Sequence, residues 1–153
     1  MAIEASLSRF KKQNLCIFIG VLTLAAIWFC YDGYLNEKFI NEHKGADGKP
    51  DSTLVFNQKS PPYFIAGAIL LGIYFFTIRN TKIVADETQL IINTREKIPY
   101  DSIQKVDKTH FGSKGYFIIT FKDQTGKEVN RRVSEKTYDN LTAILDILVV
   151  KIS

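Results

Sequence analysis

The sequence predicts an α+β membrane protein in which a two-helix transmembrane hairpin precedes a small antiparallel β-sheet or partial barrel, capped by a C-terminal helix. Two apolar blocks without a charged residue, 15–31 and 63–78, predict the transmembrane helices. Short apolar runs after residue 80 predict the strands. The chain has 153 residues and two cysteines, both in the first block, which argues against a multidomain enzyme and against a disulfide-stapled secreted fold.

The first transmembrane helix is predicted over residues 14–34, after a short cytoplasmic N-terminus of residues 1–13. Its uncharged stretch alone spans roughly 25 Å, near the lower limit for a membrane span. Trp28, Tyr31 and Tyr34 at its far end are typical of the aromatic belt at lipid headgroups. A cleaved signal peptide is the alternative, because basic residues precede the block, but bulky residues stand where signal peptidase requires small ones.

The second transmembrane helix is predicted over residues 62–79. Pro61 and Pro62 suit a first helical turn, where the missing N–H has no helical partner, and Arg79 suits a last turn at the lipid interface. This helix also has a face of small residues, which predicts close packing on the first span or on another helix. These residues are Gly67, Ala68 and Gly72.

Lysine and arginine are concentrated on one side of the two predicted spans. They precede the first span and follow the second, whereas the lysines of the connecting segment, residues 35–61, are interleaved with acidic residues. The positive-inside rule therefore predicts a multi-pass protein of the cell inner (plasma) membrane, with both termini cytoplasmic and an extracytoplasmic loop. The residues that set this orientation are Arg9, Lys11, Lys12, Arg79 and Lys82.

The extracytoplasmic loop has no complete metal-binding pattern. Residues 35–43 predict a short helix along the membrane, and residues 45–50 predict a turn. Asp47 and Asp51 lack the carboxylate ladder and closing glutamate of an EF-hand, and no second histidine or cysteine accompanies His43. The sequence predicts a solvated loop without a metal ion and leaves its role open.

The last part of the chain, residues 80–153, is predicted to be a small cytoplasmic β-domain. Its apolar runs have the length of strands and are separated by turn residues. A closing helix is predicted after Ser134 as N-cap, because apolar residues recur every three or four positions from Tyr138 to Ile152. The predicted strands are 82–85, 89–92, 97–100, 103–106, 115–121 and 128–133.

This succession of strands closed by one amphipathic helix resembles the bacterial pleckstrin-homology-like (PH-like) domains, in particular those attached to one or two membrane spans. The resemblance implies a partly open barrel or strongly bent sheet with a helical cap, and no chemistry. The segment is shorter than a complete seven-stranded version, which implies a strand that is missing or supplied by a neighbour. The resemblance covers about half of the chain and rests on 83–91, Ile98-Pro-Tyr-Asp-Ser-Ile103 with Val106, 116–123, 132–134 and the final helix.

The groups that catalysis requires are lacking. His43 and His110 are predicted on opposite sides of the membrane. Cys16 and Cys30 are predicted as small apolar residues of one span, roughly 21 Å apart along its axis and too far for a disulfide. No nucleotide-binding, metalloprotease or hydrolase motif occurs. We therefore expect no enzyme and no cofactor, and assign no catalytic, cofactor-binding or metal-binding residue.

Basic residues of the predicted domain form a candidate surface for a lipid or a protein partner. Against an anionic leaflet each of them near the surface contributes about 1 kcal/mol. A solvated face balanced by nearby carboxylates is the alternative. Specific phosphoinositide binding is not expected, because Asp86 and Glu87 occupy the first hairpin. The candidate residues are Lys105, Lys108, Lys114, Arg131 and Arg132.

Arg131 has a second interpretation, because it alternates with Val129 and Val133 along a predicted strand. This pattern indicates either a β-bulge or the rim of a binding site. Nucleic-acid binding is not expected, because the domain has a small net positive charge and no aromatic stacking platform.

Together these patterns predict a non-enzymatic, membrane-anchored adaptor that presents a PH-like protein-interaction domain to the cytoplasm. The expected partners are the lipid bilayer and a membrane or cytoplasmic protein, bound through a sheet edge or the groove beside the helix. Two alternatives stay open. One is an accessory subunit whose helix hairpin packs into a transporter or larger membrane assembly, and the other is a sensor of anionic-lipid surfaces.

Overall fold

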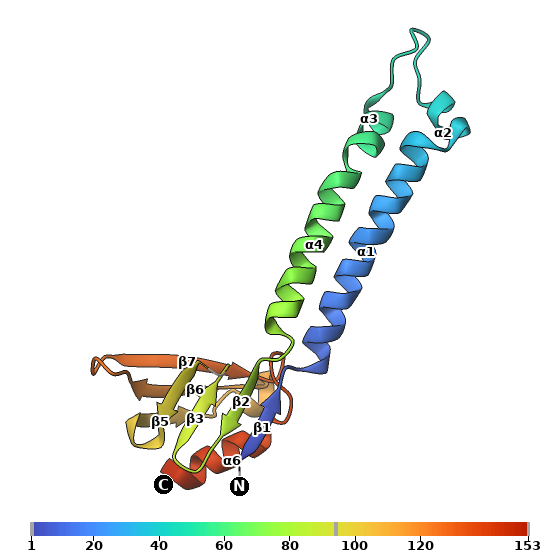
Figure 1. The fold of residues 1–153 in the computed structure, drawn as a ribbon. Helices are drawn as coiled ribbons and strands as arrows, with labels where there is room; N and C mark the ends of the chain where they lie inside the picture. The colour runs from blue at the N-terminus through green and yellow to red at the C-terminus, as the bar shows by residue number, and fades with distance from the viewer. Residues whose placement is uncertain (1, 94, 153) are drawn as a thin grey trace. The chain divides into compact units, whose positions relative to one another are not determined.

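The computed structural model describes residues 2–93 and 95–152. The chain forms two compact units, a helical unit of Gln13–Thr77 and a β-domain made of the residues up to Lys12 together with those from Ile78 onward. Two long apolar helices, two small antiparallel sheets and a C-terminal helix confirm the predicted α+β class (Figure 1).

The helical unit is an antiparallel hairpin whose two long helices lie side by side (Figure 1). Two helices are long and apolar enough to span a membrane, Arg9–Tyr34 and Ser52–Ile78. The second contains a junction at Ser60, between α3 and α4. The bounds are α1 Arg9–Tyr34, α2 Glu37–Glu42, α3 Ser52–Lys59 and α4 Pro61–Ile78.

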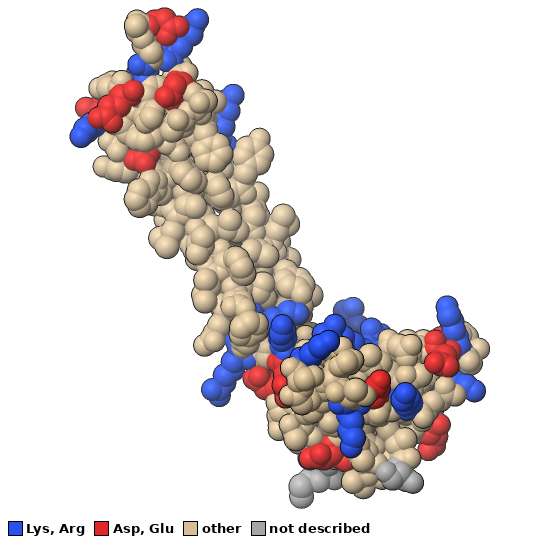
Figure 2. Space-filling model, turned by 180° about the vertical axis from the view of Figure 1, so that it is seen from behind, with Lys and Arg blue, Asp and Glu red and all other residues tan. Residues whose placement is uncertain are grey.

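The apolar side chains of the hairpin point outward. Trp28 is 69% exposed, Leu24 67% and Leu70 68%. Core helices of water-soluble proteins bury such side chains, whereas helices that cross a bilayer expose them to lipid. Figure 2 shows this uncharged surface along the hairpin, with acidic and basic side chains gathered at the loop end.

The loop predicted over residues 35–61 contains two short helices. α2 lies within the short helix predicted over 35–43, and the Asn36 side chain accepts a hydrogen bond from the Phe39 N–H at its start. α3 was not predicted. Asp51 caps it by accepting from the Leu54 N–H at 2.9 Å, and Leu54 is buried. The N-cap signal was therefore present in the sequence just before this helix.

The β-domain contains a four-stranded sheet in the order β1-β2-β3-β4 and a three-stranded sheet in the order β5-β6-β7, both antiparallel. The strands predicted over 82–85 and 89–92 are confirmed at those bounds. The strands are β1 Ile3–Ser6, β2 Lys82–Ala85, β3 Gln89–Ile92, β4 Glu96–Pro99, β5 Ile103–Asp107, β6 Tyr116–Lys122 and β7 Glu128–Ser134. The helices of the domain are η1 Tyr100–Ser102, α5 Phe111–Lys114 and α6 Leu141–Ile152.

The first strand of the domain precedes the helical hairpin in the sequence. β1 pairs antiparallel with β2, with Ser6 opposite Lys82, and it buries Ala5 completely. The segment before the first span, expected only as a terminus, is thus part of the domain. In the sequence the hairpin is inserted between two neighbouring strands, and the N-terminal segment supplies the first strand of the four-stranded sheet.

The C-terminal helix begins later than predicted. β7 continues through Ser134, which pairs with Tyr116, so Ser134 is not a helix N-cap. The Ser134 carbonyl accepts from the Thr137 and Tyr138 N–H groups in a turn, and Tyr138 lies before α6. The predicted N-cap at Ser134 was wrong because the pairing of β7 with β6 continues to the pair Ser134–Tyr116, which extends β7 through Ser134.

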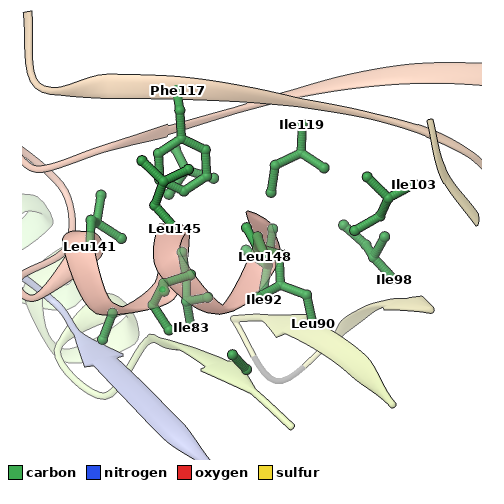
Figure 3. Packing of buried hydrophobic residues seen from close by; sticks show 14 of the residues in the cluster. Ile83, Leu90, Ile92, Ile98, Ile103, Phe117, Ile119, Leu141, Leu145 and Leu148 are labelled. Carbon is green, nitrogen blue, oxygen red and sulfur yellow. The ribbon is translucent and has the colours of Figure 1, made fainter. Parts of the chain in front are cut away.

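The core of the β-domain lies between the two sheets and α6. α6 packs against β1, β2, η1 and β5, and so covers one open side of the two sheets. Each fully buried aliphatic or aromatic side chain contributes about 1.5–3 kcal/mol through the hydrophobic effect. Figure 3 shows Leu141, Leu145 and Leu148 of α6 between Phe117 and Ile119 of β6 and Ile83, Leu90 and Ile92 of the first sheet.

Candidate functional site

A large hollow in the β-domain lies between β4 and the β6–β7 hairpin. We call it the β4–β7 groove, and its volume is about 840 Å³. One wall comes from the first sheet and η1, and the other from the second sheet. The lining residues are Gln89, Arg95, Glu96, Lys97, Pro99, Ser102, Phe121, Lys122, Asp123, Gln124, Val129 and Arg131.

Two strand edges border this groove. Among the described strands, β4 pairs only with β3 and β7 only with β6. Two backbone hydrogen bonds show which residue pairs of the β6–β7 ladder are hydrogen-bonded. At one end the Glu135 N–H donates to the Gly115 carbonyl, and at the other the Asp123 N–H donates to the Lys127 carbonyl. Because bonded and non-bonded pairs alternate in an antiparallel ladder, the backbone groups of Asn130 and Arg132 point away from β6.

Arg131 crosses the groove from β7 to β4. It lies opposite the buried Ile119, on the inner face of its sheet, and its guanidinium Nη2 donates to the Glu96 carboxylate Oε1 at 2.6 Å. The pairing of β6 with β7 runs without a shift in register, so Arg131 is not at a bulge. Arg131 instead lies at the rim of the β4–β7 groove, which agrees with the second interpretation of its alternation with valines.

A smaller cavity of about 270 Å³ lies on the other side of this ion pair. It shares Glu96 and Arg131 with the groove and is bordered by Tyr138. The buried Tyr138 hydroxyl donates to the side-chain oxygen of Asn93, which adopts a left-handed backbone conformation with φ 55°. Burial raises the pKa of Tyr138 above its ordinary value.

The five predicted basic residues do not share one surface. Arg131 faces the groove, whereas its neighbour Arg132 lies on the outer face, because successive strand residues point to opposite faces. There the Arg132 guanidinium lies 3.7 Å from the centre of the Tyr116 ring, in a cation–π contact. The other three lie in β5, in the following turn and at the end of α5. These are Lys105, Lys108 and Lys114.

The turns after β5 and after β6 share one Asp-x-Thr arrangement. The Asp107 carboxylate accepts from the Thr109 hydroxyl and N–H, and the Asp123 carboxylate accepts from the same groups of Thr125. These bonds stabilise the ionised carboxyl groups, the threonine hydroxyl being the largest cause in each, and they hold both aspartate pKa values below the ordinary value. The repeated spacing was visible in the sequence, and it marks where each strand ends.

Small residues bring the two helices of the hairpin together, though not all at the predicted positions. A Cβ at Gly67 would lie 3.5 Å from Leu22, and one at Gly72 would meet nothing within 4 Å. Ala68 is half-buried. The tightest approach is at Gly33, where a Cβ would lie 2.9 Å from the backbone carbonyl of Asn57. Gly33 was not predicted as a packing position, because its close contact depends on α3, which was not predicted either.

The loop end of the hairpin holds one histidine–carboxylate contact. His43 Nδ1 lies 2.7 Å from Asp51 Oδ2. The Leu54 N–H, and next His43, hold the pKa of Asp51 below its ordinary value. No group of three or more histidine, cysteine or acidic side chains that would hold a metal ion occurs within residues 2–93 and 95–152.

A second hollow, the hairpin groove, lies on the flank of the helical unit. Its volume is about 400 Å³, and its lining is almost entirely apolar. It is lined by Thr23, Ala26, Ile27, Cys30, Tyr31, Leu35, Pro61 and Ile65.

Comparison of the chain with family models, curated proteins and solved structures found no match.

Proposed function

We propose that this protein is a two-span inner-membrane protein whose β-domain is PH-like and serves as a non-catalytic docking module for a partner protein. The order of elements supports a PH-like fold: four strands, then three strands, then one C-terminal helix over the core. β1 completes a seven-stranded set that the segment after the hairpin does not contain by itself.

The pairing of β1 with β2 supports a common side for both termini. β1 precedes the first apolar helix and β2 follows the second, and paired strands must lie on the same side of a bilayer. The basic residues at the two junctions favour the cytoplasmic side, by the positive-inside rule. They are Arg9, Lys11, Lys12, Arg79 and Lys82.

The proposed docking function is supported mainly by the β4–β7 groove. It combines two strand edges that no described strand covers with a hollow large enough for a peptide segment. Strand edges bind extended segments through backbone hydrogen bonds, and pockets beside them supply specificity. A domain held at the membrane also raises the effective concentration of its partner there.

The membrane orientation is tested by labelling with a membrane-impermeant maleimide in intact bacterial cells. Cys16 and Cys30 are first replaced by serine, and single cysteines are placed at Ala2, at Asp47 or at Lys127. We expect labelling only at Asp47 until the cells are permeabilised. Labelling at Ala2 or Lys127 in intact cells would contradict the orientation.

Partner binding is tested by site-specific photocrosslinking in native membranes. A photoreactive amino acid replaces Lys97 in the groove or, as the matched control, Lys105 on the outer face of the other sheet. We expect a discrete protein adduct from Lys97 and none from Lys105. Equal adduct patterns from both positions would argue against a docking groove.

The hairpin groove favours a second candidate function, an accessory subunit of a larger membrane assembly. Its apolar lining fits a transmembrane helix of another protein better than a polar ligand. A photoreactive residue at Ile27, which is 61% exposed, tests it. Protein adducts from Ile27 together with none from Lys97 would replace the docking proposal with this one.

A further inference from the structure

We propose that the β4–β7 groove binds an acidic segment of the partner in an extended conformation, which adds to the free edge of β7 as a further strand. This inference rests on the docking function proposed above and names the chemistry of the ligand. It is carried by three features: the backbone groups of the β7 edge that borders the groove, the charge of the groove and its apolar floor.

The backbone groups come from the outer edge of β7. The N–H and C=O groups of Asn130 and Arg132 point away from β6, in the alternation that an added strand requires. β7 has seven residues. At about 3.3 Å per residue it extends roughly 23 Å, enough to pair with a segment of about six residues.

The charge comes from the two walls. The groove is lined by Arg95, Lys97, Lys122 and Arg131 against two carboxylates, those of Glu96 and Asp123. Glu96 already accepts from Arg131, and Asp123 accepts from Thr125 and from the Lys127 N–H. The basic lining residues outnumber the acidic ones, so the net positive charge of the groove favours an acidic segment and disfavours a basic one.

The apolar floor comes from Phe121 and Val129, which lie opposite one another on the inner face of the second sheet. In a strand added to β7, every second side chain would point to the same inner side. The expected ligand therefore alternates apolar residues facing this floor with acidic residues near the basic walls.

Glu96 has a specific role in this arrangement. Its carboxylate forms an ion pair with the Arg131 guanidinium, and the side chains of Glu96 and Arg131 are 30% and 46% exposed, respectively. A carboxylate of the entering segment would compete for the same guanidinium. The ion pair thus connects the two walls of the groove and is exchanged when the segment binds.

An extended segment fits these features better than a lipid headgroup does. A headgroup would use the cations but neither the strand edge nor the apolar floor. Anionic lipid is therefore treated as a competing outcome of the test.

The test uses the full-length protein in nanodiscs of zwitterionic phosphatidylcholine and a random eight-residue peptide library displayed on phage. We expect the enriched peptides to be rich in Asp and Glu and to lack proline at alternate positions, where a strand donates its N–H. No enrichment over empty nanodiscs, enrichment of neutral or basic peptides, or free tolerance of proline would overturn the proposal.

Charge-reversed variants locate the binding site. Lys97→Glu with Lys122→Glu changes the groove, and Lys108→Glu with Lys114→Glu makes the same change of charge outside it. For an enriched synthetic peptide we expect the groove variant to raise the dissociation constant at least about tenfold and the control variant less than about twofold. Equal losses in both variants would show non-specific attraction and overturn the proposal.

Two further outcomes separate this inference from the proposed function. Complete displacement of the peptide by vesicles of anionic phosphatidylglycerol, but not by phosphatidylcholine, would assign the cations to a headgroup and overturn the peptide ligand. A partner adduct from Lys97, together with library peptides that show no acidic preference, would retain the docking function and reject the acidic strand.

Discussion

The Arg131 guanidinium and the Glu96 carboxylate lie 2.6 Å apart and connect two sheets whose described strands share no backbone ladder. Elsewhere the sheets are held together by apolar side chains and by α6. Along the groove, this ion pair is a direct contact from β4 to β7. Its strength therefore bears on how readily the groove opens.

The ion pair is predicted to contribute little to global stability. Both side chains are partly exposed, so water screens their attraction, and such pairs contribute at most about 1 kcal/mol. A double-mutant cycle of Arg131→Ala and Glu96→Ala, measured by denaturant unfolding in detergent, should give a coupling free energy below that value. A coupling above about 2 kcal/mol would mean that the groove is firmly closed without a ligand.

Gly33→Ala is predicted to loosen the loop end of the helix hairpin. The added Cβ would lie 2.9 Å from the Asn57 carbonyl, which is backbone and cannot rotate away. We expect a loss of about 1–3 kcal/mol in resistance to unfolding by dodecyl sulfate. Gly20→Ala is the matched control, because a Cβ there meets nothing within 4 Å. Equal stability of the two variants would contradict the close packing at Gly33.

The β-domain is predicted to fold without the hairpin if β1 is retained. Since Leu7 donates its N–H to the Thr81 carbonyl, replacement of residues 8–80 by the dipeptide Asn-Gly would join β1 to β2 as an ordinary two-residue β-hairpin. We expect this shortened protein to be soluble and to unfold cooperatively in denaturant.

Removal of β1 is the matched comparison. Residues 80–153 alone lose the buried Ala5 and Leu7, and the single change Leu7→Ala should cost about 2–5 kcal/mol. The same unfolding midpoint with and without β1, measured by circular dichroism, would contradict the assignment of β1 to the domain.

The β-domain is predicted to lose stability in acid. The pKa values of Asp107 and Asp123 are lower in the folded protein than the ordinary value of 3.8. Their stabilisation is therefore complete above the unfolded pKa and is lost as pH falls through the lower folded values. Unfolding midpoints between about pH 6 and pH 2 test this. Asp107→Asn with Asp123→Asn should flatten the dependence, and an unchanged slope would contradict it.

Local patterns were sufficient for most strands of the domain. β2 and β3 are short apolar runs on either side of Asp86-Glu-Thr, so alternation and turn residues located both. β1 was missed because its partner strand follows both apolar helices, and pairing over that separation leaves no local signal. A four-residue strand before a basic helix start is also too short for periodicity to be decisive.

The candidate site was less accessible to sequence reasoning than the fold. The alternation of Arg131 with two valines left both a β-bulge and a rim open, and its partner Glu96 belongs to the other sheet. Which sheet edges face one another depends on tertiary packing, and no spacing in the sequence encodes it directly. Arg131 and Arg132 were grouped because they are adjacent in sequence, although strand geometry directs them to opposite faces.

The early position of β1 in the chain also has a consequence for biosynthesis. β1 precedes both apolar helices in the chain and therefore leaves the ribosome before they do, whereas β2 emerges only after both of them. In a membrane-inserted chain the domain can be completed only when the two strands meet in the same compartment. If only one of the two helices crossed the bilayer, β1 and β2 would lie on opposite sides of it. Folding of the β-domain would then depend on correct membrane insertion, because β1 can pair with β2 only in molecules in which both helices cross the bilayer.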